Sequence, residues 1–184
     1  MFSKLIDTIK KDKTNWERFQ AMFVEREIPS KTTLLHEGEI STQLHFIKKG
    51  CLRMWFNKDG KDITLQFFFE GQGVASIESF LSNQPTMFTI ESIEPSVLLS
   101  ITKDNFEQLN KFYPKLKDGF QEILLQRFSN YAGLFLSRIK DTPQERYEEL
   151  IRNHPEIIQR VPQHYIASFL GITPISLSRI RNRR

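Results

Sequence analysis

The side chains best suited to chemistry in this sequence are five arginines within its last 25 residues. Residues 160–184 read RVPQHYIASFLGITPISLSRIRNRR and contain no Asp or Glu. The rest of the chain holds 21 basic and 22 acidic side chains, so the net charge of +4 comes from this C-terminal segment. Guanidinium groups bind phosphates through paired hydrogen bonds. A charge of this sign on one short element indicates binding to double-stranded DNA.

The apolar residues of the same segment predict a helix that ends in a tight turn. Four of them recur at helical spacing and predict a helix over residues 163–170: Tyr165, Ile166, Phe169 and Leu170. Gly171 then supplies the permissive backbone of a turn. Thr173 is a suitable N-cap for a second helix, and Pro174 suits its first position.

The second helix, residues 173–184, is expected to have an apolar and a polar side. Ile175, Leu177 and Ile180 are expected to point inward. The residues expected to bind DNA are Thr173, Ser176, Ser178, Arg179, Arg181, Arg183 and Arg184. Two helices joined in this way form a helix-turn-helix, whose second helix lies in the major groove. The alternative is an ordinary helical hairpin with a solvated arginine face.

Composition limits the classes of protein that this sequence represents. Its 184 residues include 16 Phe, enough to fill one large core or two small ones. No run of about 18 apolar residues occurs, and the N-terminus lacks the apolar block of a signal peptide, so no membrane contact is expected. Cys51 is the single cysteine, so neither an intrachain disulfide nor an iron–sulfur cluster is expected. We therefore expect a cytoplasmic protein.

Hydrophobic patterns further upstream predict an α+β fold. Residues 2–26 have helical periodicity, and the residue pattern from Ser30 to Ile101 is typical of β-structure. Strands are expected at 32–35, 44–49, 51–56, 63–69, 87–93 and 97–101, with a helical turn within 74–82. Short strands separated by turns every 8–12 residues predict a small β-roll.

Helices are expected again after residue 102. Asp104 is expected to cap a short helix, and a long helix is expected from 114 to 140. This long helix carries an apolar stripe of Phe120, Leu124, Phe128, Tyr131 and Phe135. We expect the stripe to pair with a second copy of the chain, the alternative being burial within one chain.

The last region is expected to begin with a capped helix. Thr142 and Pro143 suit its N-cap and first position, and its apolar set is Tyr147, Leu150 and Ile151. The predicted division is residues 1–113 for a sensor domain, 114–140 for a dimerisation helix and 141–184 for a DNA-binding domain. The sequence ends at Arg184, so no β-hairpin wing is expected.

Two stretches resemble the CRP/FNR family of bacterial transcription regulators. Leu34–Phe56 is similar to the family's cyclic-nucleotide-binding-type β-roll, a double-stranded β-helix, and its glycines match Gly38 and Gly50. Glu145–Arg181 is similar to the family's DNA-binding end. The resemblance implies a homodimer that pairs through the long helix, reads a two-fold symmetric operator and responds to an effector in the roll. RNA polymerase is a further partner that it implies.

The sequence departs from the family pattern in the effector pocket. Members that bind cyclic nucleotides carry Gly-Glu for the ribose and, about ten residues on, Arg beside a small hydroxyl residue for the phosphate. The matching positions here are Ala75-Ser76 and Thr86-Met87. A buried phosphate without a guanidinium partner is strongly disfavoured. We therefore expect no tight binding of cAMP, and either another apolar or aromatic effector or none.

The recognition helix departs from the family pattern too. Well-known members begin it with Arg-Glu, where this sequence has Pro174-Ile175. The arginine one turn later is matched by Arg179, which we expect to read a guanine. Arg181, Arg183 and Arg184 are expected to contact phosphates, and Ser176 and Ser178 a base or a phosphate.

The placement of the polar residues disfavours an enzyme. His36, His45, His154 and His164 form no HxxxH or HExxH pair, and no P-loop or GxGxxG occurs. Cys51 lies in a strand-like run, which is more typical of a core residue than of a nucleophile. We expect no catalytic or metal site and no evident cofactor. The alternative to a DNA-binding regulator is a small-molecule sensor or protein-interaction module with a vestigial DNA-binding tip.

Overall fold

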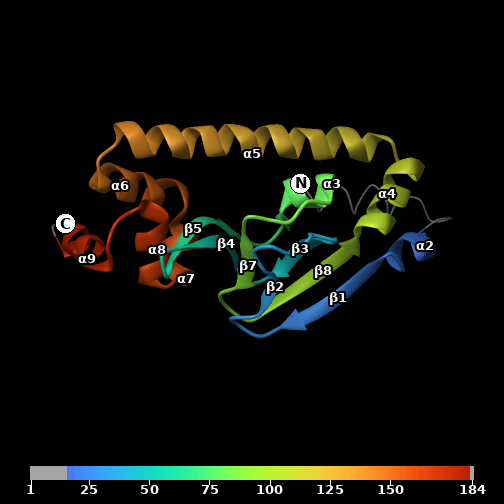
Figure 1. The fold of residues 1–184 in the computed structure, drawn as a ribbon, viewed down its shortest axis with the longest axis horizontal. Coiled ribbons are helices and arrows are strands. Elements are labelled where there is room, and N and C mark those ends of the chain that lie inside the picture. The colour runs from blue at the N-terminus through green and yellow to red at the C-terminus, as the bar shows by residue number, and fades with distance from the viewer. Residues whose placement is uncertain (1–15, 183–184) are drawn as a thin grey trace. The chain divides into compact units, whose positions relative to one another are not determined.

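The protein has an α+β fold in which an antiparallel β-roll precedes most of the helices. The structure is a computed structural model that describes residues 16–182 (Figure 1). Internal contacts divide the chain into two units. The first unit holds the described residues up to Phe56 together with Phe67–Asp118, and the second holds Asn57–Gln66 and the chain from Gly119 onward.

Two four-stranded sheets form the roll, with strand orders β1-β8-β3-β6 and β2-β7-β4-β5. β1 and β3 pair antiparallel with β8, and β2 and β4 pair antiparallel with β7. The strands are β1 Phe23–Ile28, β2 Thr33–Leu35, β3 Gln43–Lys49, β4 Leu52–Lys58, β5 Lys61–Phe68, β6 Gly73–Val74, β7 Thr89–Ser92 and β8 Ser96–Thr102. The predicted β-roll is confirmed.

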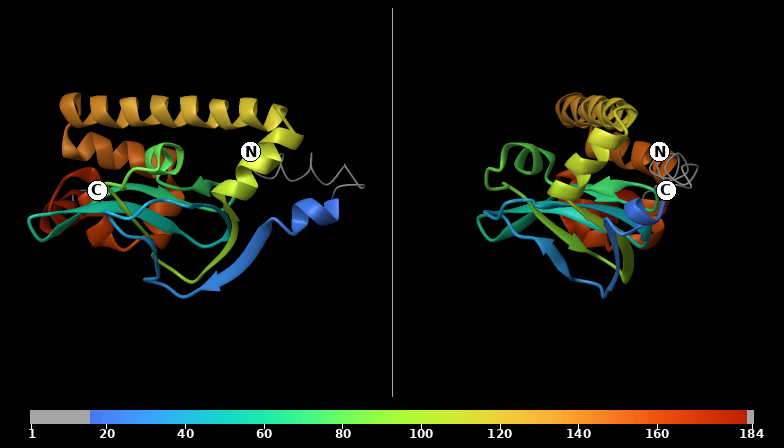
Figure 2. Two further views of the ribbon diagram at one scale, coloured as in Figure 1. Left: turned by 45° about the vertical axis from the view of Figure 1, so that its right-hand side comes forward. Right: turned by 90° about the vertical axis from the view of Figure 1, so that its right-hand side faces the viewer.

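Helices flank the roll in the sequence and make up most of the second unit. They are α2 Trp16–Gln20, α3 Ile77–Ser82, α4 Lys103–Phe112, α5 Lys115–Lys140, α6 Pro143–Asn153, α7 Pro155–Arg160, α8 Gln163–Leu170 and α9 Pro174–Asn182. Figure 2 shows α5 as one uninterrupted helix, nearly end-on in its right-hand view. Between residues 16 and 182, no helix has both the length and the apolar character to cross a membrane.

The core of the first unit contains side chains from both sheets and from the flanking helices. Leu52 and Ile90 from one sheet and Leu98 from the other are buried. The rings of Phe80 in α3 and Phe106 in α4 meet edge to face, with centroids 5.7 Å apart. The phenylalanine-rich composition therefore fills this core, as expected from the sequence.

The helix predicted over residues 2–26 is wrong at its C-terminal end. Phe23–Ile28 is strand β1, in which Val24 lies opposite Ser100 of β8. The physical reason is that pairing with β8 satisfies this backbone, and that aromatic and β-branched residues favour strands. Residues 1–15, which carry the rest of that prediction, lie outside the described residues.

Helix caps agree with the sequence in most places. Thr142 and Glu145 form the capping box that begins α6. The predicted cap at Asp104 is wrong, because Thr102 is the N-cap of α4 and its side chain accepts a hydrogen bond from the Asn105 N–H. Helix α7 was not predicted as a separate element. It begins at Pro155, directly after His154 ends α6.

His45 gives the first unit a predicted dependence on pH. This residue of β3 is buried, and its Nδ1 lies 2.8 Å from Ser100 Oγ. Burial, with the positive charge of Arg26 second, lowers the pKa of His45 from 6.5 to about 4. At pH values between about 4 and 6.5, the unfolded chain binds a proton at His45 that the folded chain does not bind. The free energy of unfolding should therefore fall, by up to about 3 kcal/mol, as the pH falls from about 7 to 4.

Urea unfolding at several pH values measures this effect. The His45→Asn variant should lose the part of the pH dependence that the histidine contributes. His36→Asn is the matched control, because His36 is exposed. Equal slopes of unfolding free energy against pH for the wild type and His45→Asn would contradict the assignment.

Candidate nucleic-acid interface

Helix α8 and the turn after it adopt the backbone expected of a helix-turn-helix. Ile166, Ala167 and Leu170 are the buried residues of α8. Gly171 ends the helix in the left-handed conformation, with φ 70° and ψ 33°. The Ile172 N–H donates to the Ala167 carbonyl at 3.0 Å, which closes the turn. The predicted role of Gly171 is confirmed.

Helix α9 begins with the predicted cap. The Ser176 N–H donates to Thr173 Oγ1 at 3.1 Å, and the hydroxyl oxygens of these two residues lie 3.0 Å apart. Leu177 is 1% exposed, so its side chain packs into the core of its unit and anchors the helix there. Cap and anchor together fix which side of α9 is presented outward.

The predicted orientation of Ile175 is wrong. Its side chain is 67% exposed, whereas Leu177 is buried. Two residues correspond to about 200° around a helix, so Ile175 and Leu177 point to nearly opposite sides. Ser178, Arg179 and Asn182 follow Ile175 at three, four and seven residues and share its outward side.

The remaining predicted DNA-binding residues fall into three groups. Ser178, Arg179 and Arg181 are exposed. Ser176 is half-buried, with its hydroxyl against the cap. Arg183 and Arg184 lie outside the described residues.

An open hollow of about 320 Å³ lies between the start of α8 and the end of α9. Its lining consists of Gln163, Ser178, Arg181 and Asn182. One guanidinium with amide and hydroxyl groups around it provides donors for a phosphate oxygen. Sequence reasoning missed Gln163 and Asn182. The spacing of Asn182, four residues after Ser178, was the available signal.

Two arginines hold the C-terminal end of α8. Arg146 donates from Nε and Nη2 to the Leu170 carbonyl at 3.2 and 3.1 Å, and from Nη1 to the Asp141 carbonyl at 2.6 Å. Arg138 Nη2 donates to the Phe169 carbonyl at 2.8 Å. Burial first, and the charge of Arg146 second, lower the pKa of Arg138. Cations at this end complement the helix dipole and donate hydrogen bonds to carbonyls that have no partner within the helix.

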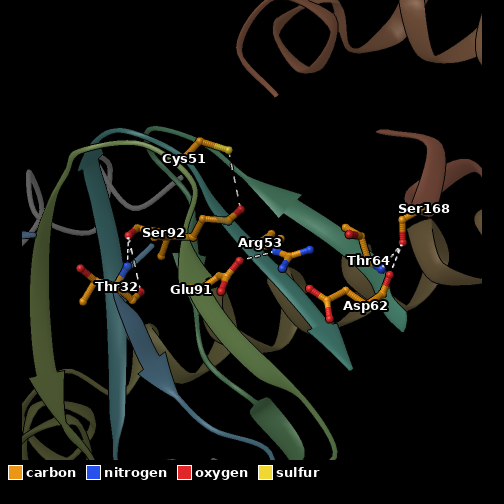
Figure 3. A network of polar contacts seen from close by, with 9 residues as sticks. Thr32, Cys51, Arg53, Asp62, Thr64, Glu91, Ser92 and Ser168 are labelled. Carbon is orange, nitrogen blue, oxygen red and sulfur yellow. Dashed lines mark hydrogen bonds and ion pairs between the residues drawn. The ribbon is translucent and has the colours of Figure 1, made fainter. Parts of the chain in front are cut away.

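A serine joins α8 to the tip of the β4–β5 hairpin, Asn57–Gln66, which belongs to the same unit. The Thr64 N–H donates to Ser168 Oγ at 2.9 Å, and Ser168 Oγ donates to the Asp62 carbonyl at 2.7 Å (Figure 3). One hydroxyl thus serves a donor and an acceptor of the β5 backbone. These two hydrogen bonds therefore hold the hairpin tip against the first helix of the helix-turn-helix.

The long helix α5 presents its apolar residues outward. Leu125, Phe128, Phe135 and Ile139 are all more than half exposed. With the exposed Ala132 they follow one another at intervals of 3, 4, 3 and 4 residues, which is the a/d pattern of a coiled coil. We call these five residues the α5 seam.

The α5 seam differs from the stripe predicted from the sequence. Phe128 and Phe135 belong to both. Phe120 and Leu124 are half-buried within the chain. Tyr131 is partly exposed, and its hydroxyl donates to Gln66 Oε1 at 2.5 Å. Sequence reasoning missed Leu125 and Ile139.

The four predicted effector-pocket residues lie in two environments. Ala75, Ser76 and Thr86 are buried in the first unit. Thr86 Oγ1 donates to Ser76 Oγ at 2.8 Å and accepts from the Phe88 N–H at 3.1 Å. Met87 is 59% exposed. The two hydroxyls therefore satisfy each other, and these positions carry no charge.

A buried ion pair lies elsewhere in the roll. Arg53 of β4 is 2% exposed, and its Nε donates to Glu91 Oε1 of β7 at 2.5 Å (Figure 3). The guanidinium also stacks 4.7 Å from the ring centre of Trp55. Arg53 and Glu91 are directly opposite each other in the β4–β7 ladder. The strand register therefore creates this pair.

Comparison with known proteins agrees with this fold and this order of elements. The family description "Cyclic nucleotide-binding domain" matches residues 25–111. The cAMP-activated global transcriptional regulator CRP of Pasteurella multocida is 27% identical over 103 residues, covering 55% of this chain and 49% of that protein. CRP of Salmonella typhimurium is 26% identical over 89 residues, covering 48% and 42%. The chain spans about half the length of these curated relatives.

Solved structures extend the similarity to nearly the whole chain. The c-di-GMP responsive global regulator CLP of Xanthomonas campestris has a TM-score of 0.75 at 18% identity, covering 94% of this chain and 91% of that one. FixK2 of Bradyrhizobium japonicum has a TM-score of 0.75 at 14% identity, covering 88% and 83%. A putative CRP/FNR-family regulator of Eubacterium rectale has a TM-score of 0.75 at 17% identity, covering 94% and 82%.

The chain is thus similar to transcription regulators of the CRP/FNR family in sequence over its first part and in fold over nearly its whole length. Its relatives are transcription regulators rather than enzymes. The domain match at 25–111 contains every predicted effector-pocket residue. The helix-turn-helix and the α5 seam lie beyond that match.

Proposed function

We propose that this protein is a homodimeric transcription regulator of the CRP/FNR type that reads a two-fold symmetric DNA site with α9 of each copy. The observation that carries the proposal is the exposed basic surface of α9. Arg179 and Arg181 are exposed on a capped and anchored helix, in a segment without acidic residues. A positive, rigidly held helix of this kind fits the major groove.

Within α9, Arg179 is the residue proposed to read a base. It shares the outward side with Ser178, in the second half of the helix. A guanidinium there can donate two hydrogen bonds to the O6 and N7 of guanine. Arg181 lines the polar hollow with Gln163 and is proposed to contact a phosphate. Thr173 and Ser176 are proposed to orient the helix, with Ser176 close to the backbone of the DNA.

Arg179→Ala should weaken specific binding by about 1–3 kcal/mol and leave binding to random DNA nearly unchanged. The loss should be confined to operators that contain the guanine. Fluorescence anisotropy with operator and scrambled duplexes at one salt concentration measures it. Arg152→Ala is the matched control, because Arg152 is exposed on α6, outside the helix-turn-helix. Equal losses on both duplexes would contradict the base-reading role.

The dimer is proposed to form through the α5 seam. Four large apolar side chains on one line of a helix that spans about 39 Å would otherwise remain in water. The coiled-coil spacing of the α5 seam favours the α5 of a second copy over a flat surface as its partner. In a coiled coil, side chains at positions a and d of one helix insert between side chains of the other helix. The two copies would then present two α9 helices to successive major grooves, about 34 Å apart.

The effector pocket is proposed not to bind cAMP. The buried Ser76 and Thr86 hydroxyls bond to each other, and a cyclic phosphate placed there would have no guanidinium from these positions. Isothermal titration of the 184-residue chain with cAMP should therefore show a Kd weaker than about 100 μM. A Kd of 1 μM or below would contradict this proposal.

The functional division that we propose is residues 1–113 for sensing, 114–140 for dimerisation and 141–184 for DNA binding. Any effector would be an apolar or aromatic molecule rather than a cyclic nucleotide. RNA polymerase is a proposed partner, and a regulator of chromosomal DNA would act in the cytoplasm.

A further inference from the structure

We infer that Ile175 contacts the C5-methyl group of a thymine and thereby selects a T·A pair in each half-site. The inference rests on the proposed DNA-binding function and adds a second specificity-determining residue to Arg179. Its starting observation is that Ile175 is 67% exposed, although it lies in the first turn of a helix whose other large apolar residues are buried or half-buried.

The position of Ile175 on α9 is the place from which base edges are reached. The N-terminal residues of a recognition helix contact bases, and Ile175 is the second residue of α9. Ile175, Ser178 and Arg179 occupy one side, opposite the anchoring Leu177. A side that presents Arg179 to the major groove therefore presents Ile175 to it as well.

The chemistry of the side chain restricts what it can read. An isoleucine side chain neither donates nor accepts a hydrogen bond, so it cannot pair with the polar edges of guanine, adenine or cytosine. Thymine alone carries an apolar group, its C5-methyl, in the major groove. Placed against any other base edge, Ile175 would exclude water from polar atoms without replacing its hydrogen bonds.

The side chain is also held in place. β-Branched residues in a helix strongly prefer one χ1 rotamer, so the contact requires little ordering on binding. The nearby Thr173 cap fixes the first turn through its hydrogen bond from the Ser176 N–H. One turn separates Ile175 from Arg179, about 6 Å along the axis. The thymine should therefore lie one or two base pairs from the guanine read by Arg179.

The test replaces that thymine with deoxyuridine in an operator obtained by selection, a change that removes only the methyl group. We expect the wild-type protein to bind about fourfold more weakly with one half-site changed, and about 15-fold more weakly with both changed, because one buried methyl is lost per half-site. The Ile175→Ser variant should bind the thymine and deoxyuridine operators equally. Deoxyuridine at other thymines of the motif is the control.

The outcomes separate this inference from the function on which it rests. A two-fold motif without a fixed thymine next to the guanine, or equal wild-type binding to both operators, would overturn the role of Ile175 and leave DNA reading intact. The absence of any enriched motif would reject the proposed function itself. Circular dichroism of Ile175→Ser should match the wild type, because the side chain is exposed.

Discussion

Replacing both Phe128 and Phe135 with aspartate is expected to convert the proposed dimer to a monomer. Each copy would lose two aromatic side chains from the α5 seam, and each buried Phe contributes about 1.5–3 kcal/mol. The new carboxylates would also have to be desolvated without partners. Light scattering should report a monomer, and affinity for a two-fold symmetric operator should fall by 100-fold or more because the two α9 helices would no longer be linked.

The control for this variant uses exposed apolar residues of the other unit. Leu81→Asp with Met87→Asp makes the same chemical change on side chains that are 54% and 59% exposed. This pair should leave both the dimer and the operator affinity unchanged. A dimer that survives in the Phe128/Phe135 variant would show that the α5 seam is not the dimer interface.

Removing one partner of the Arg53–Glu91 pair is expected to have the largest effect on stability. Glu91→Ala leaves the buried guanidinium of Arg53 without this carboxylate, and breaking a buried ion pair in this way costs about 3–5 kcal/mol. Urea unfolding followed by tryptophan fluorescence measures it, since Trp16 and Trp55 both lie in the first unit.

Two further variants separate charge from packing at this site. Arg53→Met combined with Glu91→Leu removes both charges and should recover most of the lost stability, because two apolar side chains need no partners. Glu25→Ala breaks the Lys48–Glu25 pair, in which both side chains are about half exposed, and should cost no more than about 1 kcal/mol. Similar losses for Glu25→Ala and Glu91→Ala would contradict the argument.

Local chemistry made the helix-turn-helix predictable from the sequence. Gly171, Thr173 and Pro174 each specify a backbone conformation by themselves, so the turn and the cap could be placed without tertiary information. The inward orientation predicted for Ile175 is wrong because an apolar side chain need not be buried. Its angle of about 200° from Leu177 already placed it outside.

Other features depended on contacts between distant residues. β1 could not be distinguished from a helix, because its pairing partners in β8 lie 68 to 78 residues later. The Arg53–Glu91 pair follows from strand register across 38 residues. Apolar residues surround much of α5, so their spacing alone does not show which of them face outward. The exposure of Leu125 and Ile139, together with the partial burial of Phe120 and Leu124, defines the α5 seam.

Selection of binding sites from a random duplex library at physiological salt tests the central claim most directly. The 184-residue chain, without added effector, should enrich a two-fold symmetric motif with half-sites centred about one helical turn apart, each containing the guanine proposed to contact Arg179. An Arg179→Ala protein should lose that guanine from the motif. Enrichment of no motif, with and without cell extract as a source of effector, would contradict the account.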